Sequence, residues 1–128
     1  GYKNLEMLAS IQNRIGEDEI RETLAEVGLD PDDKRTYRKY SLGMKQRLGI
    51  AAAVMGEPDV VLLDEPTNAL DETGLEMLRE IVLMQKRRGA IVILASHDRF
   101  FLESLADKIL VFEDGHIQTL RQKADVVC

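Results

Sequence analysis

The sequence predicts an α/β fold in which a helical portion precedes a mainly parallel sheet. Two short apolar runs, residues 60–63 and 91–94, are typical of strands that are covered on both faces of a parallel sheet. The segment between them has the spacing of an amphipathic helix, which favours a strand–helix–strand unit. The first 57 residues carry their apolar side chains at helical spacing instead.

The helical portion contains three expected helices. Residues 4–13 and 18–27 each present apolar side chains on one helical face, and Gly28 is a natural C-terminal cap for the second helix. After a polar connection, Ser41 offers a side-chain oxygen at the N-terminus of a third helix, residues 42–55.

The second portion alternates strands and helices. The elements expected there are, in order, a strand at 60–63, a helix from near Asp71, a strand at 91–94, a helix at about 99–106, and strands at 109–112 and 117–120 around a turn at 114–115. We therefore divide the chain into a helical portion of residues 1–57, an α/β portion of residues 58–122 and a tail of residues 123–128.

Composition limits the classes of partner. At 128 residues and 45% hydrophobic, the chain is long enough for one globular core. Its net charge of −6 provides no overall positive field, so no nucleic-acid partner is expected. The apolar runs are far shorter than the roughly 18 residues of a membrane-spanning helix, and the single Cys128 can form no intrachain disulfide. Both features favour a soluble protein of the cytosol.

Polar residues follow both strands of the expected parallel sheet. Ligands of open α/β sheets bind beyond the carboxyl ends of the strands, which places Asp64, Glu65 and His97 at one rim. Of two consecutive carboxylates, one can hold a hydrated Mg²⁺ while the other activates a water molecule. The alternative is that the acidic pair only ends a strand and caps a turn before Pro66.

Three segments resemble motifs of the ATP-binding cassette (ABC) family, in that family's order. Residues 60–71 (VVLLDEPTNALD) resemble its Walker B motif and D-loop, residues 40–47 (YSLGMKQR) its signature motif, and residues 96–98 (SHD) its switch-histidine loop. The resemblance implies the C-terminal part of a P-loop NTPase domain, with a helical signature subdomain in front of the sheet. It also implies ATP and Mg²⁺ as cofactors.

The resemblance assigns the reacting groups. It makes Glu65 the general base that polarises the attacking water, His97 the residue that contacts the γ-phosphate, and Asp64 the residue that positions Mg²⁺. A histidine that follows a strand is otherwise more often a structural hydrogen-bonding residue.

Further nucleotide contacts are implied by the same resemblance at Ser41, Gly43, Gln46 and Asp71. In this family the signature motif meets ATP held by an opposing cassette, so a second ABC subunit is the expected partner. The alternatives are structural: Ser41 and Asp71 are also suited to be ordinary N-caps of the helices that follow them.

The sequence departs from the family pattern at two points. The commonest signature reads Leu-Ser-Gly-Gly-Gln, whereas positions 40–44 read YSLGM, a version that resembles drug- and peptide-exporting cassettes of the bacitracin-resistance type. No glycine of the chain is followed by lysine, so the phosphate-binding motif Gly-x-x-x-x-Gly-Lys-Ser/Thr is missing from it. We therefore expect this chain by itself to be inactive.

Three functions are compatible with the sequence. The favoured one is the ATP-hydrolysing subunit of an exporter, bound to a membrane permease at the cytoplasmic face of the membrane. A soluble cassette protein acting in translation is the second, because residues 96–102 (SHDRFFL) resemble that branch. The third is a regulatory α/β domain without catalysis, against which the retained Asp64, Glu65 and His97 argue. The basic cluster at residues 34–39 is assigned no role.

Overall fold

The computed structural model describes residues 1–12 and 15–122 and divides the chain into two compact units, Gly1–Ala95 and Ser96–Cys128. The first unit contains the whole predicted helical portion and the first part of the predicted α/β portion. The proposed boundary after residue 57 stays a prediction. The tail at 123–128 and the predicted helix end at Asn13 lie outside the described residues.

The N-terminal part of the first unit is helical, as predicted. Its elements are α1 (Tyr2–Gln12), α2 (Glu17–Glu26), the short 3-10 helix η1 (Tyr37–Lys39) and α3 (Leu42–Val54). The three α-helices form because each buries apolar residues at helical spacing; the buried set includes Leu5, Ile20, Leu24, Leu48 and Ile50. Gly28 ends the second helix with a left-handed φ of 76°, the conformation for which glycine is favoured.

A parallel strand pair completes the first unit. β1 (Val60–Asp64) pairs with β2 (Ile91–Ala95) from Val60 opposite Ile91 to Asp64 opposite Ala95. The crossover is α4 (Glu72–Arg87), which packs against β2 and α3, while α3 packs against β1. Each strand is one residue longer than the sequence predicts, because the polar or small residue at its end still joins the ladder.

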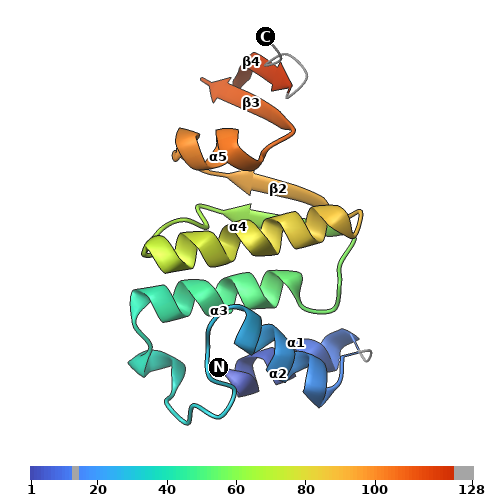
Figure 1. Ribbon diagram of the computed structural model, residues 1–128, viewed down its shortest axis with the longest axis vertical. Helices are drawn as coiled ribbons and strands as arrows, with labels where there is room; N and C mark the ends of the chain where they lie inside the picture. The colour runs from blue at the N-terminus through green and yellow to red at the C-terminus, as the bar shows by residue number, and fades with distance from the viewer. Residues whose placement is uncertain (13–14, 123–128) are drawn as a thin grey trace. The chain divides into compact units, whose positions relative to one another are not determined.

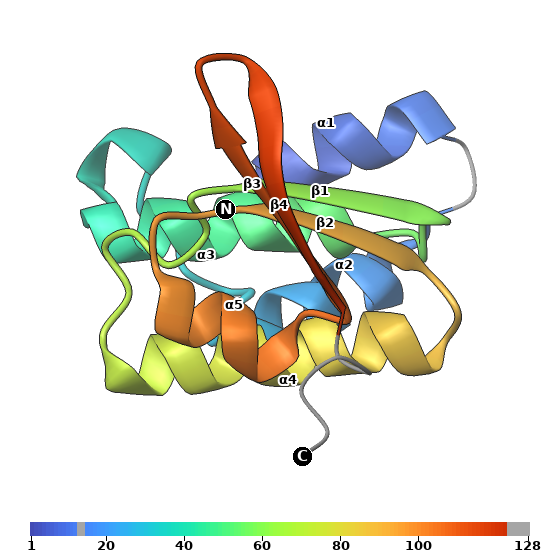
Figure 2. The ribbon, with the colours of Figure 1, turned by 90° about the horizontal axis from the view of Figure 1, so that it is seen from above.

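Only one face of this strand pair is covered within the described residues. Val61 is 1% exposed, whereas its neighbour Leu62 is 67% exposed, and on the adjacent strand Ile91 and Ile93 are 61% and 52% exposed. Both α3, which packs against β1, and α4, which packs against β2, lie on one side of the strand pair (Figures 1 and 2). A continuous apolar run shows that both faces of a strand are apolar, not which of them is packed.

The second unit consists of a short helix and a hairpin. α5 (Arg99–Leu105) begins at Asp98, whose carboxylate accepts a hydrogen bond from the Phe101 amide at 2.9 Å. β3 (Lys108–Glu113) pairs antiparallel with β4 (His116–Gln122). Asp114 and Gly115 have φ of 49° and 77°, so both central residues of the predicted turn are left-handed, as a tight hairpin requires. Among the described residues, no helix has the length and apolar character that crossing a membrane demands.

Candidate functional site

Ser41 starts α3 and caps it. Its backbone is extended, with φ −63° and ψ 164°, and its hydroxyl oxygen accepts a hydrogen bond from the Met44 amide at 3.1 Å. The predicted cap is thus confirmed. Ser41 is also exposed, so the first turn of a 13-residue helix opens to solvent beside it. Such a turn has free N–H groups and a positive dipole end, the combination that binds anions.

Aromatic packing fixes the residue in front of Ser41. Tyr40 is only 6% exposed and its ring lies 6.2 Å from that of Tyr37, centroid to centroid. The Lys45 ammonium lies 5.1 Å from the Tyr37 ring centroid, within range of a cation–π contact. The start of α3 is therefore anchored from both sides of Ser41.

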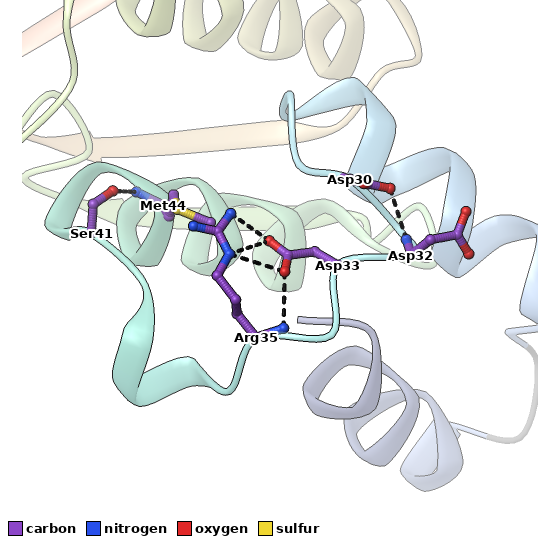
Figure 3. A network of polar contacts seen from close by, with 6 residues as sticks. All are labelled: Asp30, Asp32, Asp33, Arg35, Ser41 and Met44. Atoms are coloured by element: carbon purple, nitrogen blue, oxygen red, sulfur yellow. Dashed lines mark hydrogen bonds and ion pairs between the residues drawn. The ribbon is translucent and has the colours of Figure 1, made fainter.

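The preceding loop is ordered by its own polar contacts (Figure 3). Asp33 accepts hydrogen bonds from the Arg35 side chain, at 2.6 Å from Nη2, and from the Arg35 amide at 2.9 Å. These contacts lower the pKa of Asp33 from its ordinary 3.8 to about 2. Because the folded-state pKa is the lower one, the contact contributes fully above pH 4 and is lost as the pH falls toward 2. One member of the basic cluster is thus already paired within the loop.

The end of β1 carries the two predicted acidic residues. Asp64 is exposed and lines a pocket of about 200 Å³, together with residues of α3 that include Gln46 and Ile50. Glu65 is half-buried, and its amide donates to the Ala95 carbonyl at 2.7 Å, which prolongs the parallel ladder by one bond. Its φ of 46° is left-handed, a conformation that costs a non-glycine residue on the order of 1 kcal/mol or more.

A tight loop of residues 65–71, here called the β1–α4 loop, connects Glu65 to α4. The Asn68 amide donates to the Glu65 carbonyl at 3.2 Å, and Ala69 takes a second left-handed φ of 61°. Asp71 ends the loop as the N-cap of α4, because its carboxylate accepts from the Gly74 amide at 2.8 Å. The alternative role of Asp71 as a helix cap is therefore confirmed, and a cap leaves its second carboxylate oxygen for other contacts.

α3 lies directly against this loop. The Gln46 side-chain amide donates to the Glu65 carbonyl at 3.2 Å, and the Arg47 guanidinium lies 3.6 Å from the Asp71 carboxylate. A Cβ added to Gly43 would lie 3.0 Å from the Ala69 carbonyl oxygen, so glycine is needed for the close approach. The structure brings the predicted residues Gly43, Gln46 and Asp71 together with Glu65; their contacts with nucleotide stay predictions.

Arg47 is the residue that sequence reasoning missed. Besides its ion pair with Asp71, its Nη1 donates to the Val27 carbonyl at 2.7 Å, beyond the end of α2. Its side chain is only 18% exposed. One signal was present: residues 42–54 contain just two charged positions, and a buried arginine in an apolar helix needs partners.

His97 belongs to the second unit, where it follows β2 by two positions in the sequence. It is exposed and lies between Ser96, whose hydroxyl accepts from the Asp98 amide at 3.0 Å, and the N-cap Asp98. These turn contacts hold the backbone on either side of the imidazole. The grouping of His97 with Asp64 and Glu65 stays a prediction.

The described residues contain no group of three or more His, Cys, Asp or Glu side chains that could hold a metal ion by themselves. Mg²⁺ usually keeps several waters and is held by one or two carboxylates together with substrate phosphates. The exposed carboxylate of Asp64 at the strand end fits the part of one such protein ligand.

Replacing Ser41 by Ala is expected to lower the free energy of unfolding by about 1 kcal/mol, because the cap of α3 is lost. Ser41→Asn retains a capping oxygen and should cost less. Ser10→Ala serves as a matched control, since that exposed hydroxyl donates to the Met7 carbonyl within its own helix and caps no helix N-terminus. Urea unfolding monitored by circular dichroism measures the difference; equal losses at both serines would contradict the cap.

Comparisons with known proteins identify the same family that the sequence motifs resemble. The ABC transporter family profile matches residues 3–68, just over half of the chain. An uncharacterized ABC transporter ATP-binding protein of Bacillus subtilis, YybJ, is 41% identical over 118 residues, which are 92% of this chain and 54% of that protein. The bacitracin transport ATP-binding protein BcrA of Enterococcus faecalis is 39% identical over 91% of this chain and 38% of its own length.

A solved structure shows the same arrangement. The ATP-binding subunit of an ABC transporter superimposes with a TM-score of 0.86 at 25% identity, over 97% of this chain and 53% of that one. The α/β architecture predicted from the sequence is thereby confirmed. The chain spans about half the length, or less, of the relatives named above.

Proposed function

Because the chain belongs to the ABC transporter family, we propose that it supplies the signature and Walker B parts of an ATP-binding subunit. That subunit hydrolyses ATP and powers the export of a small molecule or peptide through a membrane permease. The observation that carries the proposal is the contact between two structures: the capped, exposed N-terminus of α3 and the β1–α4 loop that bears Glu65. This contact holds the N-terminus of α3, which is suited to bind an anion, in a fixed position relative to the loop that bears the Glu65 carboxylate.

Each side chain has a proposed part in the reaction. Glu65 polarises the attacking water, and Asp64 holds Mg²⁺, which neutralises charge on the phosphates when it is bound. Phosphoryl transfer depends mainly on positioning and electrostatic stabilisation, so a carboxylate fixed by its backbone suits the chemistry. His97 contacts the γ-phosphate.

The N-terminal turn of α3 has a proposed part in a dimer. Ser41 and the nearby amides, including that of Gly43, bind the γ-phosphate of ATP held by a second ABC subunit, because Ser41 is exposed and the first turn of a helix has N–H groups without intrahelical partners. Asp71 completes the D-loop contacts. The subunit lies at the cytoplasmic face of the membrane through its permease, and the net charge of −6 on this chain favours no nucleic-acid partner.

Similarity to a bacitracin transport protein and to a lantibiotic transport protein, SrtF of Streptococcus pyogenes, which is 40% identical over 116 residues, supports export of a peptide or drug. Co-purification tests it. A tagged protein extended to the length of these relatives is expected to bring down a membrane protein from solubilised membranes, and Glu65→Gln should bring down the same partner. Recovery with ribosomes and without a membrane protein would favour the role in translation instead.

A further inference from the structure

Three contacts fasten the β1–α4 loop to α3. Gln46 donates to the carbonyl of Glu65 at the start of the loop, at 3.2 Å. In the middle of the loop, the Ala69 carbonyl oxygen approaches α3 closely because Gly43 has no side chain there. Arg47 pairs with Asp71 at the end, at 3.6 Å. The contacting residues of α3 lie at positions 43, 46 and 47, so they share one helical face.

We propose that Gln46 and Arg47 are positioning residues that hold Glu65 in its reactive orientation, rather than contacts for nucleotide. The inference rests on the proposed function, because it takes Glu65 to be the general base. Under this inference α3 and the β1–α4 loop move together as one rigid body. Ser41 lies at one end of that body, and Glu65 lies at the start of the loop.

Gln46 acts on a strained backbone. Glu65 has a φ of 46°, and such a conformation persists only where the surroundings hold it. Its carbonyl accepts two hydrogen bonds, from the Asn68 amide within the loop and from the Gln46 side chain, each at 3.2 Å. The Gln46 bond ties the Glu65 carbonyl to α3, as the bond to Ala95 ties the Glu65 amide to β2, so it helps to fix the direction from which the Glu65 side chain leaves the strand end.

The Arg47 guanidinium occupies a space that is bordered by two glycines. Cβ atoms added to Gly28 and Gly74 would lie 2.6 Å from its Nη1 and 3.2 Å from its Nη2, so both glycines leave room for the guanidinium. Its planar fork reaches the Val27 carbonyl and the Asp71 carboxylate together. A lysine ammonium has no such fork and cannot serve both partners. Asp71 in turn caps α4, so Arg47 connects the ends of α2 and of the loop.

The test uses a protein extended to the length of the relatives and compares kcat with KM. Gln46→Met keeps the side-chain length but removes the donor. We expect kcat to fall roughly 10- to 100-fold with little change in KM for MgATP, because a misplaced catalytic group costs rate rather than binding. Gln46→Lys, which retains a donor, should recover most of the loss. Gln118→Met, on the exposed surface of β4, is the matched control and should change neither value.

A second comparison separates positioning from general loss of structure. In a Glu65→Gln background, adding Gln46→Met should cause no further loss of turnover and leave nucleotide affinity unchanged, since there is no carboxylate left to position. Likewise, Arg47→Lys should lower kcat, and combining it with Gln46→Met should cost less than the product of the single effects.

The outcomes are distinct. If Glu65→Gln abolishes turnover but Gln46→Met leaves kcat unchanged, the inference is wrong and the proposed function stands. If Gln46→Met instead raises KM and weakens nucleotide binding in both backgrounds, Gln46 is a nucleotide contact and the inference is again wrong. If Glu65→Gln keeps its turnover, the general-base assignment is wrong, and the positioning role is wrong with it.

Discussion

Replacing Glu65 by Gln is expected to lower steady ATP turnover by roughly 10²- to 10⁴-fold, the range that a positioned general base contributes. Glutamine has nearly the same shape, so the left-handed backbone and the hydrogen bonds of the Glu65 carbonyl and amide should survive the change. Its amide cannot accept a proton from water. Asp64 is untouched, so binding of MgATP should persist.

The measurement uses a protein extended to the length of the relatives, of which this chain spans about half or less. Phosphate release gives turnover, and equilibrium dialysis with labelled ATP gives binding. Glu80→Gln is a suitable control, because it makes the same chemical change at an exposed position of α4. Rapid hydrolysis by Glu65→Gln, equal to that of the Glu80 variant, would remove Glu65 from the role of base.

The second large effect concerns nucleotide affinity. This chain has no Gly-x-x-x-x-Gly-Lys-Ser/Thr motif, the loop that cradles the α- and β-phosphates with backbone N–H groups and a lysine. Charge-assisted hydrogen bonds contribute about 1.5–3 kcal/mol each, so the loss of several should weaken MgATP binding by at least about 100-fold. Calorimetric titration of the chain and of an extended version should show heat of binding only for the extended one.

Either result of that titration is informative. Binding by the extended chain alone would support the proposal that this chain supplies the signature and Walker B parts but not the phosphate-binding loop. Glu65 and His97 can then be studied in the extended protein. Tight binding by the short chain would require a phosphate site elsewhere. Among the described residues the pocket beside Asp64 would be the first place to look, because Gln46 and the start of the β1–α4 loop line it.

Local features were well predicted from the sequence. The caps at Ser41 and Asp71 and the turn at Asp114 follow from short-range chemistry that one segment carries by itself. A serine ahead of an apolar helix or an Asp-Gly between two strands has the same preference in any fold.

Features that depend on two segments were not predictable in this way. Whether a second face of the sheet is packed was not predictable, because apolar side chains such as Leu62 and Ile93 do not reveal whether a helix packs on them. The contacts of Gln46 and Arg47 depend on where α3 meets the β1–α4 loop, which no local pattern specifies. The left-handed conformation of Glu65 is similar: glutamate has no preference for it, so the surrounding contacts must impose it.

The left-handed conformation of Glu65 brings two requirements, thermal stability and catalysis, into conflict at a single position. Glycine occupies positive φ at no steric cost, so a library screened only for survival on heating would enrich glycine at position 65. The surviving variants would be more heat-resistant proteins that lack a carboxylate at this position. Selection for turnover is expected to keep glutamate there instead, so variation at position 65 among laboratory-evolved descendants would report whether turnover or heat resistance had been selected.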